Sequence, residues 1–176
     1  MSYANRGRNF EILIEYWAEL YKKQNLAFLI KAPPEIRRIR TMSAGKFVAV
    51  YAAKGKPDYT MLVDGNACLF DAKQFNGKSL PFKNIHQHQV NDLEQWQEQG
   101  GHSFLLLHAK TLGSQWVLPL NAFLNKYKIW QLRKARMIPV PKGHGSIPMK
   151  TITDHGLMFD HSGFLTPMLQ LINNTK

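Results

Sequence analysis

The sequence predicts a mixed α/β fold built on one central sheet. A strongly amphipathic helical pattern opens the chain, and short apolar runs bounded by turn residues then alternate with further helical patterns. The 176 residues are 44% hydrophobic and 20% charged, which is typical of a globular chain and excludes a disordered one. We therefore expect one domain over residues 1–176, with helices packed on the sheet.

Each element is predicted from a local signal. The first helix is predicted from large apolar residues that recur every three or four positions: Phe10, Leu13, Ile14, Trp17, Leu20 and Tyr21. The expected helices cover residues 8–24, 84–99, 121–134 and 167–173. The second helix is expected to start at an Asn84 N-cap and to end at Gly100-Gly101, and Thr166 is the expected cap of the last helix. The expected strands cover residues 26–31, 36–41, 46–51, 59–63, 67–72, 103–108 and 115–118.

Two pairs of these strands are expected to form hairpins. The pair within residues 59–72 turns at Asp64-Gly65, a dipeptide that favours a tight turn. The pair within residues 36–51 turns at Ser43-Ala44-Gly45 and carries four cations: Arg37, Arg38, Arg40 and Lys46. This second hairpin is too short and too basic to belong to the core.

Charge gives the first indication of function. The chain carries 23 Lys and Arg against 12 Asp and Glu, a formal net charge of +11, and its sequence pI is about 9.8. The excess lies toward both ends, with eleven cations against five anions over residues 1–60 and eight against two over residues 126–176. Clustered cations favour a polyanionic partner, most simply nucleic acid, over the alternative of a generally basic protein.

Several protein classes are excluded. The longest apolar runs are too short to span a membrane, and no membrane partner is expected. Cys68 is the only cysteine in the sequence, so a disulfide framework and a thiolate zinc cluster are excluded. The absence of a P-loop motif argues against nucleotide hydrolysis. Because the N-terminus also has no signal-peptide pattern, we expect a reducing, cytoplasmic location.

Asp58, Asp71 and Lys73 are the candidate catalytic residues. Asp58 lies at the entry to one expected strand, and Asp71 and Lys73 lie two residues apart on its hairpin neighbour, so their side chains share a face. Carboxylates there could hold Mg²⁺, or Mn²⁺ in its place, to polarise a phosphodiester while the lysine steadies a water. The alternative is that Asp58 starts a turn and that Asp71 and Lys73 form a solvated pair.

Two helices supply further candidates. His88 and Gln89 fall on the stripe of the second helix that is expected to face the sheet. A buried Gln89 amide needs partners, of which metal or metal-bound water is one, whereas His88 suits a half-buried histidine or a phosphate contact. Glu11, Glu15 and Glu19 form a row on the first helix that is typical of a solvated flank; a metal-binding role for Glu11 or Glu15 is the less favoured alternative.

These residues lie in segments that resemble the RecU family of Holliday junction resolvases from Gram-positive bacteria and their phages. The resemblance spans nearly the whole chain, and its most specific segment runs from Pro81 to Gln89. The other matching segments are Asn5-Arg6-Gly7, Lys31 before Pro33-Pro34, Asp58-Tyr59, Phe70-Asp71-Ala72-Lys73, Gly100-Gly101, Gly145-Ser146-Ile147-Pro148 and His155-Gly156.

The resemblance implies a restriction-endonuclease-like fold with a protruding basic β-hairpin, here called the stalk (residues 34–53), that enters the centre of a four-way DNA junction. It implies that Asp58, Asp71 and Gln89 bind Mg²⁺ and that Lys73 is catalytic. Phosphate contacts at the branch would come from Arg37, Arg38, Arg40 and Lys46. The family acts as a homodimer that nicks two strands symmetrically in recombination and repair, and a RecA-like recombinase or a branch-migration helicase is an expected partner.

Three features depart from the family pattern. Asp71 stands where the family usually has Glu, Gly55-Lys56-Pro57 replaces a Ser/Thr-rich stretch before Asp58, and the stalk is shorter than in the bacterial enzymes. A non-cleaving architectural protein that binds junction DNA is therefore the alternative function. A nuclease of the same superfamily without junction preference is a further one.

Overall fold

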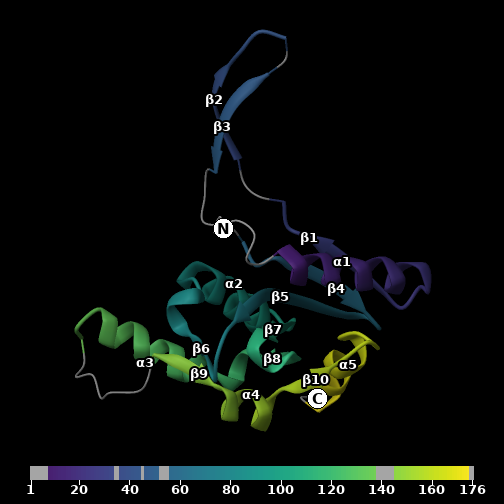
Figure 1. Ribbon diagram of the computed structural model, residues 1–176, viewed down its shortest axis with the longest axis vertical. Helices are drawn as coiled ribbons and strands as arrows, with labels where there is room; N and C mark the ends of the chain where they lie inside the picture. Colours follow the sequence, from purple (N-terminus) through teal and green to yellow (C-terminus); the bar gives the residue numbers. More distant parts are fainter. Residues whose placement is uncertain (1–7, 34–35, 45, 52–55, 138–144, 175–176) are drawn as a thin grey trace.

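The structure, a computed structural model, describes residues 8–33, 36–44, 46–51, 56–137 and 145–174. Its centre is a six-stranded sheet in the order β1-β4-β5-β7-β8-β10 (Figure 1). The strands are β1 (Ala27–Lys31), β4 (Tyr59–Val63), β5 (Asn66–Phe75), β7 (His102–Ala109), β8 (Ser114–Pro119) and β10 (Leu157–Phe159). All neighbours pair antiparallel except β5 and β7, which are parallel, so the sheet is mixed as predicted.

Helices cover both faces of this sheet. One face packs against α1 (Arg8–Lys23) and α5 (Leu165–Asn173), and the other packs against α2 (Gln87–Glu98), α3 (Leu124–Lys134) and α4 (Met149–His155). Side chains along β5 point alternately to the two faces of the sheet, so each face has its own core. Cys68 and Phe70 belong to the core under α1, whereas Leu69 and Phe75 belong to the core under α2. No helix in the described residues is long and apolar enough to cross a bilayer.

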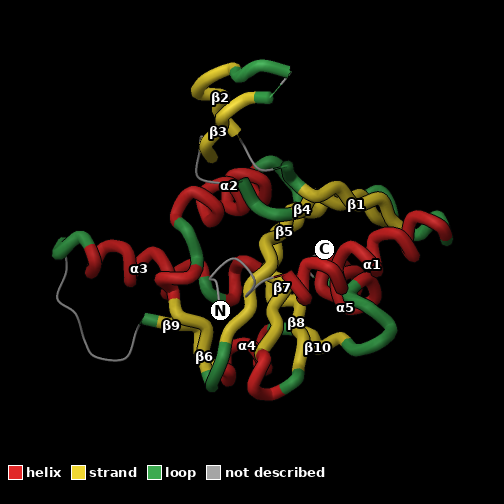
Figure 2. Tube along the Cα trace, turned by 45° about the horizontal axis from the view of Figure 1, so that its top comes forward, coloured by secondary structure: helices red, strands yellow, loops and turns green. Residues whose placement is uncertain are grey.

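The predicted basic hairpin is present and stands apart from the main sheet (Figure 2). It consists of β2 (Ile36–Thr41) and β3 (Phe47–Tyr51), paired antiparallel with a bulge between Arg38 and Arg40. The chain leaves the main sheet after β1 and returns at β4, and the N–H of Ala32 donates a 2.8 Å hydrogen bond to the carbonyl of Asp58 across the base. Residues 34–35, 45 and 52–53 of the expected stalk lie outside the described residues.

The start of α2 differs from the prediction. The helix begins at Gln87 with His86 as its N-cap, so the assignment of Asn84 as N-cap is wrong. Asn84 instead ends the 3₁₀ turn η2 (Phe82–Asn84), because Phe82 and Ile85 are buried and the Tyr127 hydroxyl donates a 3.0 Å hydrogen bond to the Ile85 carbonyl. The predicted end of the helix is confirmed, with Gly100 at a φ of 88°.

Long-range strand pairing explains two further differences from the predicted elements, and helix boundaries account for the rest. β5 continues past the expected end at Ala72 because β7 pairs with it as far as Phe75. The expected loop that follows contains β6 (Ser79–Pro81), which pairs with the equally short β9 (Ser146–Pro148). Thr166 lies inside α5, whose N-cap is Phe164, and so it is not the cap. Short 3₁₀ turns, η3 (Lys110–Leu112) and η4 (Leu120–Ala122), flank β8, and η4 delays the start of α3.

Candidate active site

The candidate active site lies where the chain enters β4, on the face of the sheet that α2 covers. The register of β4 and β5 pairs Tyr59 with Phe70, which brings the preceding Asp58 alongside Asp71. Asp58 is held there because its Oδ2 accepts a 2.9 Å hydrogen bond from the backbone N–H of Ala72. The structure therefore brings together the two carboxylates that the sequence places on neighbouring strands.

Asp71 is the most enclosed residue of the site. Its side chain is 0% exposed, and its Oδ2 lies 2.5 Å from Nζ of Lys73. Its Oδ1 accepts a 2.8 Å hydrogen bond from Nε2 of Gln89, which is itself buried on α2. The Lys73 ammonium donates to Oε1 of Gln89 at 3.1 Å. Asp71, Lys73 and Gln89 thus form a closed triangle of polar contacts that joins β5 to α2.

Burial changes the acid–base chemistry of Asp71. Desolvation raises the pKa of its carboxyl from 3.8 to about 8, the Lys73 ammonium opposes this rise, and the neighbouring Asp58 carboxylate adds to it. Apart from its 2.5 Å contact with Nζ of Lys73, Oδ2 of Asp71 has no hydrogen-bond partner among the described residues. Further positive charge, such as that of a divalent cation, would stabilise the ionised form of this carboxyl.

The donors present suit a hard cation that prefers oxygen. Asp58 and Asp71 offer carboxylate oxygens and Gln89 offers an amide oxygen, and Mg²⁺ is commonly held by one or two carboxylates with water and phosphate in its remaining positions. Within the described residues, no group of three or more His, Cys, Asp or Glu side chains is placed to hold a metal ion. A magnesium site here would therefore use both carboxylates and the Gln89 amide.

The glutamates of α1 face a lysine on the edge strand β1. Nζ of Lys31 lies 3.0 Å from Oε2 of Glu11 and 2.5 Å from Oε1 of Glu15. Lys31 is the sheet partner of Tyr59, and its ammonium lies 5.9 Å from the centroid of that ring. Burial, together with the negative charges of Glu11, Asp58 and other carboxylates, raises the pKa of Tyr59. Glu11 and Glu15 are thus ion-paired next to the site.

The cations predicted to bind DNA belong to β2 and to the residue before β3, in the hairpin that stands away from the main sheet (Figure 1). Arg38 and Arg40 are exposed on β2, and Lys46 is exposed just before β3. The Arg38 guanidinium lies over the Phe47 ring, 5.5 Å from its centroid. Arg37 also belongs to β2, and its side chain is outside the described part of the chain. The structure therefore separates a polar cluster on the sheet from a cationic hairpin.

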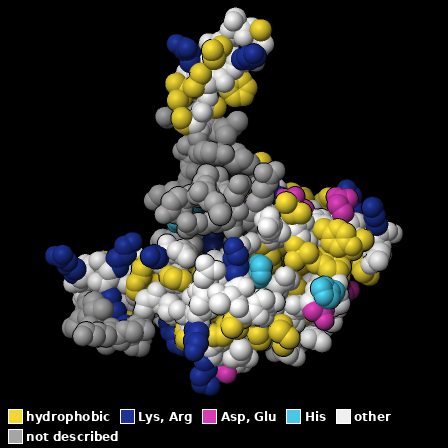
Figure 3. All heavy atoms as spheres, viewed as in Figure 1, with side chains coloured by type: hydrophobic (Ala, Val, Ile, Leu, Met, Phe, Trp, Pro, Cys, Tyr) yellow, Lys and Arg dark blue, Asp and Glu magenta, His cyan; other side chains and the backbone are white. Residues whose placement is uncertain are grey.

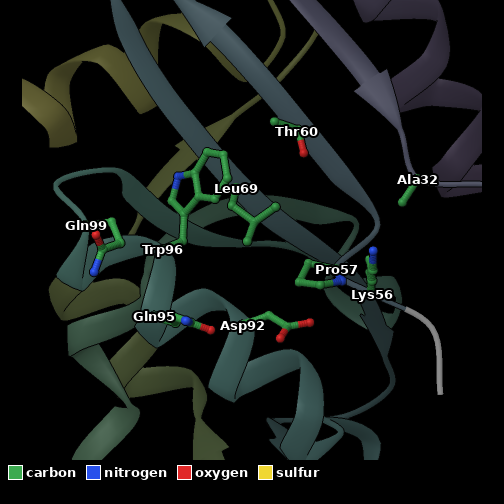
Figure 4. Close-up of a pocket in the computed structure, with 9 residues that line it drawn as sticks. All are labelled: Ala32, Lys56, Pro57, Thr60, Leu69, Asp92, Gln95, Trp96 and Gln99. Atoms are coloured by element: carbon green, nitrogen blue, oxygen red, sulfur yellow. The ribbon is translucent and has the colours of Figure 1, made fainter. Parts of the chain in front are cut away.

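Two cavities adjoin the site. One, of about 500 Å³, lies between Lys56 and Pro57 on one side and Trp96 of α2 on the other, over Thr60 of β4 (Figure 4). The second, of about 430 Å³, has Gln89 in its wall together with cationic and aromatic residues of η2 and α3. Sequence reasoning selected His88 and Gln89 of this second cavity but not its α3 residues Trp130, Gln131 and Lys134, although the basic segment after residue 126 was the available signal.

Comparison with known proteins identifies the family. Residues 5–174 match the family model described as RecU, Recombination protein U. The chain is 32% identical over 162 residues to the Holliday junction resolvase RecU of Streptococcus sanguinis (strain SK36), covering 89% of this chain and 76% of that protein. It is 31% identical over 180 residues to the Holliday junction resolvase RecU of Streptococcus mutans serotype c, covering 98% and 86%.

A solved structure of Hjc, a Holliday junction resolvase from Archaeoglobus fulgidus, matches 85% of this chain and 91% of that chain at 12% identity, with a TM-score of 0.43.

A mixed sheet flanked by helices, with Asp58 beside Asp71 and Lys73 on adjoining strands, defines a restriction-endonuclease-like fold. Within that class the sequence matches make the assignment specific. The chain belongs to the RecU family.

Proposed function

We propose that this protein is a Mg²⁺-dependent endonuclease that resolves four-way (Holliday) DNA junctions by symmetric, paired nicking during recombination and repair. The observation that carries the proposal is the buried Asp71 carboxyl, joined to Lys73 and Gln89 and set beside Asp58 on a chain of net charge +11. The names of the streptococcal relatives supply the substrate class.

Each residue of the cluster has a distinct role in this proposal. Asp58, Asp71 and the amide oxygen of Gln89 would hold the metal, which supplies a Lewis acid for the phosphodiester and makes a water more acidic. Lys73 orients the attacking water and stabilises the charge that develops at the phosphate. The hydrogen bonds from Ala72 to Asp58 and from Gln89 to Asp71 orient both carboxylates before DNA binds. Mn²⁺, which shares the preference for oxygen ligands, should replace Mg²⁺.

Symmetric cleavage of two strands needs two copies of this site, so we propose a homodimer. β1 is an edge strand, and its Phe28 and Ile30 are 50% and 55% exposed. They lie opposite Leu62 and Thr60 of β4, and Leu62 is also 55% exposed. An apolar strip next to an unpaired strand edge is the kind of surface that a second subunit covers. The cavity beside Trp96 borders this strip because Thr60 lines it (Figure 4).

The stalk supports recognition of the junction. Its cations, Arg37, Arg38, Arg40 and Lys46, would contact phosphates at the branch point, where four strands bring their negative charges together. A RecA-like recombinase or a branch-migration helicase would present the junction to the dimer. Activity on recombining DNA would place the protein in the cytoplasm.

The direct test uses a labelled synthetic four-way junction and a linear duplex with matched arms. Purified protein is incubated with each DNA in Mg²⁺, in Mn²⁺ and in chelator, beside the Asp58→Ala variant. Paired, symmetric nicks that require the metal, the junction and Asp58 are the expected result. Tight junction binding without cuts, even in Mn²⁺, would instead support a non-cleaving architectural protein. Equal cutting of both DNAs would indicate a nuclease without junction preference.

The role of Lys73 has its own test. Lys73→Ala should lower the cleavage rate by about 10²-fold or more, because it removes a cation placed to stabilise the transition state. Junction affinity should be preserved, because the Lys73 side chain is only 14% exposed and lies against Asp71. The matched control is Lys78→Ala, which removes an exposed lysine from the loop after β5. Equal losses of binding and cleavage in Lys73→Ala would refute the assigned role.

A further inference from the structure

A second cationic surface lies beside the candidate active site and separate from the stalk. It is a groove of about 430 Å³ between the start of α2 and the end of α3, here called the α2–α3 groove. Its cationic, aromatic and polar lining residues include Lys83, His86, His88, Trp130, Gln131 and Lys134. Lysine and arginine side chains gather over the α3 end of the molecule (Figure 3).

Positive charge dominates this groove. Lys83 and Lys134 are exposed, and the described residues that line the groove include neither Asp nor Glu. The first turn of α2, which also lines the groove, has no acidic residue, so the partial positive charge of the helix N-terminus is not neutralised from within that turn. The surface is therefore suited to an anion.

Planar rings accompany the cations. The His86 and His88 rings stack with their centroids 5.5 Å apart, and the Lys134 ammonium lies 5.4 Å from the centroid of Trp130. The Trp130 ring is fixed by packing on Phe82, at a centroid separation of 5.6 Å. Cations interleaved with fixed rings are typical of surfaces that follow a nucleic-acid strand, with cations at phosphates and rings against sugars or bases.

Gln89 makes the groove continuous with the candidate active site. Gln89 lines the groove, while its amide bonds Asp71 at 2.8 Å and Lys73 at 3.1 Å. A DNA strand whose scissile phosphate lies at Asp71 therefore has the α2–α3 groove as adjoining positive surface. We propose that this groove binds the phosphates of the DNA strand next to the scissile phosphate, within the junction arm that is cut. The proposal rests on the proposed function and adds to it a DNA-binding surface distinct from the stalk.

The two surfaces make different predictions about DNA specificity. The stalk would contact a branch point, which only a junction has, whereas the α2–α3 groove would contact an arm, which any duplex has. Removing the groove cations should therefore weaken the binding of a junction and of a linear duplex by the same factor. Removing the stalk cations should weaken junction binding more than duplex binding.

The test combines Lys83→Gln with Lys134→Gln. Affinity for the four-way junction and for the matched linear duplex is measured in chelator over a range of salt concentrations. Loss of two phosphate contacts should lower the slope of log affinity against log salt by about 1.8 and weaken both DNAs equally. Lys83→Arg with Lys134→Arg keeps the charge and should keep the slope. The control, Lys22→Gln with Lys23→Gln, makes the same charge change in the last turn of α1.

The outcomes separate this proposal from the proposed function. An unchanged salt slope in the groove variant, or a change no larger than that of the α1 control, overturns the groove as a DNA site. Wild-type protein that cuts junctions while the groove variant binds like wild type overturns the groove alone. If the wild-type protein binds junctions but never cuts them, the proposed endonuclease activity is refuted. The salt slope of the groove variant then still decides whether the groove binds DNA. Wild-type protein that binds neither DNA overturns both.

Discussion

The buried carboxyl of Asp71 predicts how the stability of the metal-free protein depends on pH. Desolvation raises the pKa of Asp71 from 3.8 to about 8, so between these values the native state keeps a proton that the unfolded chain releases. The free energy of unfolding therefore falls as pH rises through this window, by about 1.4 kcal/mol per pH unit. From about pH 5 to about pH 7, the loss amounts to roughly 3 kcal/mol.

The assay compares wild type with Asp71→Asn, which is nearly isosteric and does not titrate. Urea unfolding of both proteins is followed in chelator from about pH 5 to about pH 7. Both proteins carry the same seven histidines, so the contribution of those side chains cancels in the difference. Asp71→Asn should become the more stable protein as pH rises, and the difference in unfolding free energy should grow by about 1.4 kcal/mol per pH unit.

Magnesium should reverse this effect in the wild type alone. In the proposed site magnesium binds the ionised Asp71 carboxylate, so its binding should release a proton and raise the stability of the wild type near pH 7, with little effect on Asp71→Asn. Unfolding free energies that stay parallel for the two proteins across the whole pH range would refute the reasoning, because they would show that Asp71 titrates alike in the native and unfolded states.

Three further predictions concern the stalk, the proposed dimer contact and the core. Arg38→Gln with Arg40→Gln should lower the salt slope of junction binding by up to about 1.8, measured by equilibrium titration, and an unchanged slope would remove these residues from the junction interface. Ile30→Glu should yield monomers in analytical ultracentrifugation, whereas Ile129→Glu, at another exposed apolar position on α3, should not; a dimer that survives Ile30→Glu contradicts the β1 contact. Tyr59→Phe should raise the free energy of urea unfolding by about 1 kcal/mol, because the buried Tyr59 hydroxyl has no hydrogen-bond partner among the described residues; a loss of similar size would show that it has one.

Local rules were sufficient to predict much of the geometry of the candidate site. Asp58, Asp71 and Lys73 sit on one hairpin, so a tight turn and the two-residue period of a strand bring them together without help from distant parts of the chain. The orientation of Gln89 toward the sheet followed from helical periodicity. Its partners did not, because the contacts with Asp71 and Lys73 depend on how α2 crosses β5. The burial of Asp71 depends on the same packing.

Elements defined by tertiary contacts were missed. Asn84 has the side chain of a good N-cap, which is worth about 1 kcal/mol, but burying Phe82 and Ile85 is worth roughly 1.5–3 kcal/mol each, and packing therefore decides where α2 starts. β6 and β9 are three-residue strands far apart in the chain, too short to show any periodicity. Thr166 suited a cap by type alone, yet Phe164 takes that position while buried in the core.

The way the stalk joins the main sheet has a consequence for how such proteins can diversify. The chain departs after β1 and returns to β4, its immediate neighbour, where the N–H of Ala32 donates a hydrogen bond to the carbonyl of Asp58. A hairpin of another length inserted at this point would leave the register of β1 and β4 intact, because the entropy cost of closing a loop grows only slowly with its length. If the stalk contacts the branch point as proposed, a change of hairpin would alter DNA recognition while Asp58 keeps its place beside Asp71.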